Sequence, residues 1–272
     1  MKTELIKKLG IILILLLIGT ACSQFSPNLD IQINTLKKAI RENPNNAEAY
    51  FELGLVYETQ GRYRKSKEAL WQAIKLNPNH AKAYNLLGRI FEKDADYTLA
   101  IDHYEKAIQS EDHFMEPYIL LAGLYREMGI KSTSQDFRQK QMKILSAALT
   151  KCDRENDKSS CITILNNLSV LILEIQANNK NSDLSLAVKY AQQGLELMKD
   201  ERDLKKYVKY NSDNKQIHLD RGLFHYLLGD AYQELNRPEQ ALNEHNNALS
   251  EFKQADNKYW ISKAEAEVKE KN

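Results

Sequence analysis

The sequence has few of the residues that end helices or form turns, with 10 glycines and 5 prolines among 272 residues. A chain so poor in turn formers and so rich in Ala, Leu, Glu, Lys and Gln is expected to be helical. Charge of one sign is also not in excess, because 38 Lys and Arg residues stand against 37 Asp and Glu residues. The whole molecule therefore has no electrostatic field that favours nucleic acid, and we expect no nucleic-acid partner.

Motifs of the common enzyme classes are missing as well. The sequence contains no HExxH zinc signature, no GxSxG nucleophile turn and no glycine-rich phosphate loop. The 6 histidines are scattered along the chain, and the 3 cysteines do not have the spacing of metal ligands. We therefore expect a protein without catalytic residues, metal site, cofactor or small-molecule substrate.

The N-terminal segment differs from the rest of the chain. Lys2, Lys7 and Lys8 precede the apolar run IILILLLIGTA, which ends at Cys22. A run of roughly a dozen apolar residues is shorter than the about 20 that span a membrane, and it has the plan of a secretory signal. The residues IGTAC resemble the lipobox of bacterial lipoproteins, although Gly19 stands where that class has a larger aliphatic residue.

The lipobox resemblance implies a signal peptide over residues 1–21, a lipid on Cys22 and a tether over residues 22–30. Ser23 is not acidic, which by analogy implies an anchor in the outer membrane with the folded part facing the periplasm. An uncleaved anchor and an ordinary cleaved signal are the alternatives.

A pattern of aromatic, leucine and small residues recurs every 34 residues. Tyr50, Leu53, Gly54 and Tyr57 have the i, i+3, i+4, i+7 spacing of one helix face, and Tyr84, Leu87, Gly88 and Phe91, then Tyr118, Leu121, Ala122 and Tyr125, repeat it. After the first helix of a unit comes a turn and a second apolar stripe, so each unit is expected to form two antiparallel helices.

These units resemble the tetratricopeptide repeat (TPR) family. The resemblance implies an all-α fold, an α-solenoid in the form of a right-handed superhelix of antiparallel helix pairs. It covers a half-unit at 31–46, five units at 47–80, 81–114, 115–152, 161–198 and 217–250, and leaves 251–272 as a capping helix or tail. Extra chain enters near 130–139, 152–161, 177–183 and 199–216, and we expect it in loops or lengthened helices.

A second face of each first helix is left over by this packing, and in the TPR family that face lines a concave groove. The matched positions form the expected partner-binding groove: Phe51, Leu55, Asn85, Arg89, Lys93, Ile119, Arg126, Asn166, Val170, Tyr226 and Asp230. Phe51 and Leu55 would anchor an extended peptide or an amphipathic helix, while Arg89 or Arg126 would orient it. The alternative is that Phe51 and Leu55 pack on the N-terminal half-unit.

Cys152 and Cys161 flank a polar segment at the junction of two units. An exported chain meets an oxidising compartment, so a disulfide is expected there if the two residues lie close together. Closing a ten-residue loop would stabilise the fold by roughly 2.5 to 3 kcal/mol. Two unpaired thiols are the alternative.

The sequence thus predicts a non-enzymatic adaptor, lipid-anchored in a bacterial cell envelope, that binds another envelope protein or peptide. By resemblance, such lipoproteins assist the assembly of pilus secretins, outer-membrane proteins or wall-synthesis enzymes. Two other classes stay open: an enzyme or regulatory subunit with its chemistry in the 130–216 inserts, and a purely architectural envelope component.

Overall fold

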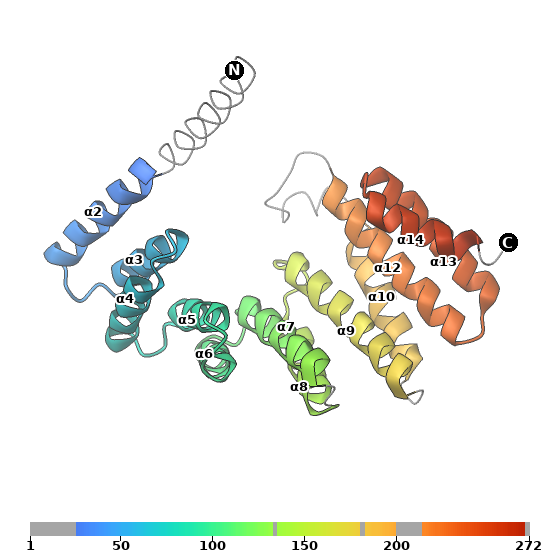
Figure 1. The fold of residues 1–272 in the computed structure, drawn as a ribbon, viewed down its shortest axis with the longest axis horizontal. Helices are drawn as coiled ribbons and strands as arrows, with labels where there is room; N and C mark the ends of the chain where they lie inside the picture. Colours follow the sequence, from blue (N-terminus) through green and yellow to red (C-terminus); the bar gives the residue numbers. More distant parts are fainter. Residues whose placement is uncertain (1–25, 133–134, 180–182, 200–213, 270–272) are drawn as a thin grey trace, which may run out of the picture. The chain divides into compact units, whose positions relative to one another are not determined.

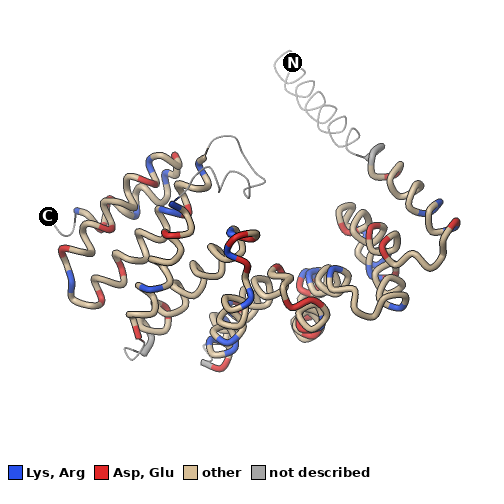
Figure 2. The backbone as a smooth tube through the Cα atoms, turned by 180° about the vertical axis from the view of Figure 1, so that it is seen from behind, with Lys and Arg blue, Asp and Glu red and all other residues tan. Residues whose placement is uncertain are grey.

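The computed structural model describes residues 26–132, 135–179, 183–199 and 214–269, and these residues form helices and no strands. The chain divides into two compact units, one that ends at Glu111 and one that begins at Asp112. In both units, basic and acidic residues are interspersed along the helices (Figure 2). The predicted all-α fold built from helix pairs is confirmed. The predicted signal peptide and Cys22 lie outside the described residues.

From residue 26 on, where its description begins, the first unit contains one single helix followed by two helix pairs (Figure 1). Its helices are α2 (Ser26–Glu42), α3 (Ala47–Thr59), α4 (Tyr63–Leu76), α5 (Ala81–Lys93) and α6 (Tyr97–Ser110). Helix α2 packs on α3 through Ile33, which is buried with Leu53, Val56 and Tyr57. Helix α2 begins at Ser26, so the last five positions of the predicted tether over residues 22–30 are helical.

The second unit is also built of packed helices. It contains α7 (Met115–Ser132), α8 (Gln135–Lys151), α9 (Lys158–Asn179), α10 (Leu184–Leu197), α12 (Lys215–Glu234), α13 (Pro238–Gln254) and α14 (Lys258–Lys269). Each helix packs on the next, and α12, α13 and α14 lie side by side (Figure 1). The extra chain near 130–139 lengthens α7 and begins α8, whereas most of the 199–216 insert lies outside the described residues.

The turn inside a helix pair has the same backbone form in three of the pairs. Gly61, Ala95 and Asn236 follow the first helix of their pairs, with φ angles of 70°, 59° and 56°. The next amide N–H donates back into the helix in each case, from Arg62 to the Tyr57 carbonyl at 2.8 Å in the first pair. This left-handed ending satisfies carbonyls at the end of the first helix and reverses the chain into the second.

Glycine on the first helix lets a ring of the second helix lie directly on its backbone. A Cβ added to Gly88 would be 2.6 Å from two carbons of the buried Tyr104 ring. Gly54 has the same relation to Leu70, and Gly229 to His245, with 16 residues between the partners each time. The spacing recurs because the two helices of each pair pack against each other at equivalent positions along their lengths.

Helix α9 is apolar enough by length and composition to span a membrane, with a mean hydropathy of 1.4 over residues 158–177. Its side chains are instead used for packing within the second unit. Ile164, Leu165, Leu168 and Leu171 are fully buried there. The core position of α9 accounts for its composition.

A disulfide joins the end of α8 to the start of α9. Cys152 and Cys161 are bridged, with their Cα atoms 5.7 Å apart. The loop between them is held further by the Asp153 carboxylate, which accepts hydrogen bonds from the backbone N–H groups of Glu155 and Asn156. The connection between two helix pairs is therefore fixed both covalently and by hydrogen bonds.

Candidate functional site

The second unit contains a cleft formed by four helices, and three of these are the first helices of pairs. Its volume is about 650 Å³. The lining residues are Arg126 from α7, Asn166, Asn167, Val170, Leu173, Glu174 and Ala177 from α9, Leu223, Tyr226, Leu227, Asp230, Gln233 and Glu234 from α12, and Trp260 and Glu267 from α14. A volume of this size lies within the range of about 300 to 1,000 Å³ that ligand-binding pockets have.

The floor of the cleft is apolar and rigid. Tyr226 and Trp260 meet in an edge-to-face contact, with 5.5 Å between ring centroids. Trp260 also stacks on the fully buried Phe252, again at 5.5 Å. Because packing from α13 fixes both rings, the aromatic surface they offer is ordered before any partner arrives.

Polar groups surround this floor. The amide Oδ1 of Asn166 is buried and has no hydrogen-bond partner, which leaves an acceptor that a donor from a bound molecule would satisfy. Arg126 donates from Nε to Glu174 Oε1 at 3.1 Å, so α7 and α9 are joined by an ion pair at the rim. The arrangement suits a segment that has apolar side chains and a free N–H group.

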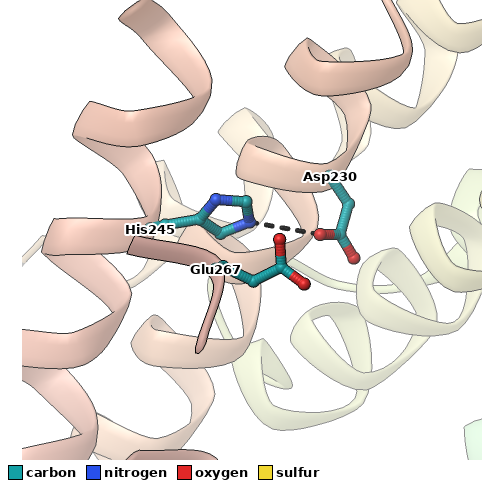
Figure 3. Close-up of side chains that lie close together, drawn as sticks. All are labelled: Asp230, His245 and Glu267. Atoms are coloured by element: carbon teal, nitrogen blue, oxygen red, sulfur yellow. Dashed lines mark hydrogen bonds and ion pairs between the residues drawn. The ribbon is translucent and has the colours of Figure 1, made fainter. Parts of the chain in front are cut away.

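At the end of the cleft formed by α12 and α14, three helices bring together two carboxylates and one imidazole. The side chains are Asp230, His245 and Glu267, and one ligand atom of each lies within 4.8 Å of the others. Figure 3 shows the carboxylates of Asp230 and Glu267 facing the His245 ring. The scattered histidines of the sequence gave no sign of this cluster.

Five of the predicted groove residues line the cleft: Arg126, Asn166, Val170, Tyr226 and Asp230. Ile119, the sixth one in this unit, is half-buried and does not line it. Sequence reasoning missed Trp260 and Glu267, because the charged segment after residue 250 was expected only to cover the end of the stack. The signal that points to a binding role is Trp260, a large aromatic residue in that segment.

In the first unit, two of the predicted groove residues are used for packing. Phe51 is only 8% exposed and belongs to a core cluster with Leu70, Ala83 and Leu86, while Leu55 packs against the same cluster. Phe51 is therefore a contact between two successive helix pairs. The cluster lies on the side of α4 and α5, not on the N-terminal half-unit that the alternative prediction named.

Asn85, Arg89 and Lys93 also serve the packing of the first unit. Asn85 is 4% exposed, and its Oδ1 has no hydrogen-bond partner. Lys93 Nζ lies 2.6 Å from Glu58 Oε1, and Arg89 lies 3.6 Å from the same oxygen. The hydrogen bond with Glu58 raises the pKa of Lys93 above its ordinary value. These cations neutralise a buried carboxylate, and the orienting role of Arg89 stays a prediction.

Comparisons with known proteins agree with this architecture. The family described as Tetratricopeptide repeat matches residues 57–112, and the family described as TPR repeat matches residues 33–61. A search of curated proteins found no match.

Several solved structures are similar to the chain. YrrB, described as a TPR protein with an unusual peptide-binding site, matches with a TM-score of 0.54 and 15% identity, covering 85% of this chain and 97% of that one. MamA matches with a TM-score of 0.48 and 22% identity, covering 69% and 95%. Pseudomonas aeruginosa pilF matches with a TM-score of 0.45 and 18% identity, covering 82% and 90%. The likeness to YrrB bears on the fold.

Proposed function

We propose that this chain, which matches tetratricopeptide-repeat models over residues 33–112, is a non-enzymatic adaptor that binds a segment of another protein in the cleft of its second unit. The observation that carries the proposal is the cleft of about 650 Å³ with its rigid aromatic floor. Tyrosine and tryptophan are the residues that most often dominate binding energy at protein interfaces. The repeat fold presents such a surface without needing catalytic groups.

The bound segment is apolar in its centre and has a main-chain or side-chain N–H group for Asn166. Val170, Tyr226 and Trp260 supply the surface that its apolar side chains cover. The unpaired acceptor on Asn166 gives this surface a direction, because a buried acceptor is stabilised when a donor reaches it. A helix or an extended peptide with these groups fits the four-helix cleft.

A cleft variant separates this proposal from an architectural role. Val170→Glu places a charge among apolar groups and is expected to weaken partner binding by at least about 30-fold, the effect of losing a hot spot of 2 kcal/mol. Leu186→Glu is the matched control, because Leu186 is 37% exposed on α10 and does not line the cleft. Circular dichroism checks that both variants keep their helices.

The partner for this measurement is found by photo-crosslinking in cells from position 227, with position 186 as the control. Synthetic segments of the captured protein are then titrated against the purified chain and both variants. A partner segment that binds the Val170→Glu variant as tightly as the unaltered chain would overturn the proposal, and so would equal capture from the two positions.

We also propose that the chain is a lipoprotein anchored through Cys22 to the outer membrane and facing the periplasm. The charged start, the short apolar run and the small residues before Cys22 support this. The adaptor would then act in assembling an envelope complex such as a pilus secretin, outer-membrane proteins or the wall-synthesis machinery. Membrane fractionation tests the anchor: Cys22→Ala is expected to move the chain into the soluble fraction, and unchanged membrane association would contradict it.

A further inference from the structure

The cluster at the end of the cleft has the donor atoms of a metal site. His245 Nε2 lies 3.1 Å from Asp230 Oδ1, and a Glu267 oxygen lies within 4.8 Å of both (Figure 3). The three residues come from α13, α12 and α14, so their convergence depends on the packing of three helices. A small cation placed between these atoms would be about 2 Å from each after small rotations of the carboxylates.

The imidazole is held in position by its surroundings. His245 is 0% exposed, and its ring lies on the backbone of Gly229, where an added Cβ would be 2.4 Å from Nε2. On another side the ring contacts Tyr226, with 5.3 Å between centroids. A ring confined in this way keeps Nε2 directed at the carboxylates, as a preorganised ligand requires.

The Glu267 carboxylate is oriented by a hydrogen bond from a residue outside the ligand set. The Tyr226 hydroxyl donates to Glu267. Hydrogen bonds of this kind from residues outside the ligand set fix the orientation of metal-binding carboxylates.

The local charge also favours a cation. Asp230 and Glu267 face each other beside a buried ring, and their repulsion is reduced by any positive charge that enters. Among the residues that line the cleft in the described part of the chain, Arg126 is the sole Lys or Arg, and it is paired with Glu174.

We propose that Asp230, His245 and Glu267 bind one Zn²⁺ ion, with the remaining coordination position open to the cleft. Zn²⁺ binds both histidine nitrogen and carboxylate oxygen, and zinc sites with three protein ligands keep a fourth position open. Ca²⁺ takes six to eight oxygens and Mg²⁺ keeps an octahedral shell, so both fit this set poorly. The ion takes the place of the proton between Nε2 and Asp230, and binding releases that proton when it is present.

The zinc site is independent of the adaptor function, because its ligands hold the ion whether or not a partner occupies the cleft. If both proposals hold, the open position lies where a bound segment can supply a carboxylate or an imidazole. The ion would also link α14 to α12 and α13, and a ligand that binds only the folded chain stabilises it.

Isothermal titration of ZnCl₂ into the full chain, purified in detergent and treated with a chelator, tests the site directly. We expect one equivalent of Zn²⁺ to bind and the temperature of unfolding to rise. Asp230→Asn and Glu267→Gln keep the size of each side chain and are each expected to weaken binding by at least about tenfold, since loss of an outer partner alone costs that much. Glu265→Gln, on the same helix, is the matched control.

Zinc binding by other histidines is distinguished by the double variant Asp230→Asn/Glu267→Gln. His218 and His225 also have glutamate partners, at 2.6 Å each, so a signal that survives in the double variant comes from such pairs. Equal affinity in the double variant, or no binding to the unaltered chain, would overturn the proposal. In that case the cluster is only a hydrogen-bonded contact that holds α14 in place.

Discussion

Gly194→Ala is expected to lower the free energy of unfolding by about 3 kcal/mol, the upper end of the usual cost of overfilling a core. Gly194 lies in α10 against the ring of Phe224 in α12, and an added Cβ would be 2.2 to 2.5 Å from three ring carbons. Phe224 is 1% exposed, so the ring has no open space into which it can move. Urea denaturation followed by circular dichroism measures the loss.

Gly123→Ala is the matched control for this substitution, because the same methyl group meets nothing within 4 Å on α7. There the better helix propensity of alanine is expected to stabilise the chain by about 0.5 to 1 kcal/mol. A smaller partner should relieve the clash, so Phe224→Leu is expected to cost less in the Gly194→Ala background than alone. A Gly194→Ala variant as stable as the Gly123→Ala variant would contradict the close contact of α10 and α12.

Asp220→Asn is expected to stabilise the chain by about 2 to 3 kcal/mol at pH 7, on the scale of 1.36 kcal/mol for each pKa unit. Burial on α12 raises the pKa of Asp220 from 3.8 to about 6, although a hydrogen bond from the Gln216 amide at 2.8 Å lowers it in part. The folded chain therefore holds this proton at pH values where the unfolded chain has lost it. Asparagine has no charge to bury and still accepts the hydrogen bond from Gln216.

The sign of the pH dependence follows from the raised pKa. The stability that Asp220 contributes in its protonated form is complete below pH 3.8 and is lost as the pH rises through about 6. The gain from Asp220→Asn should accordingly be small at pH 4 and reach its full size above pH 7. Asp136→Asn, at an exposed ion pair on α8, is the control and should change stability by less than about 1 kcal/mol. A gain that is the same at pH 4 and pH 7 would contradict the prediction.

The cleft could be predicted only in part. Asn166 and Tyr226 were found because they occupy the same position in successive repeats, and a repeating position faces the same way wherever repeats stack. The same reasoning failed for Phe51, which has that position in the first unit. There helix α5 of the same unit covers it with Ala83 and Leu86, so an equivalent place in the sequence is a core place in the structure.

The zinc ligands were beyond sequence reasoning for another reason. His245 has the place that Tyr104 has in an earlier unit, and both rings lie on a glycine of the preceding helix. The Tyr104 hydroxyl extends beyond that glycine and donates to Glu92 at 2.6 Å, whereas the shorter His245 side chain pairs with Asp230. Glu267 joins them from a helix outside the repeat pattern.

The sequence by itself determined the helices, their pairing and the places of close contact, because a period of 34 residues and glycines at fixed positions are local properties of the chain. The tertiary structure alone decided which repeated positions stay open. It also decided that α14 brings Trp260 and Glu267 to the cleft. Local periodicity specifies which face of a helix is apolar, but whether that face is covered depends on the neighbouring helix, and that neighbour is set by packing over the whole unit.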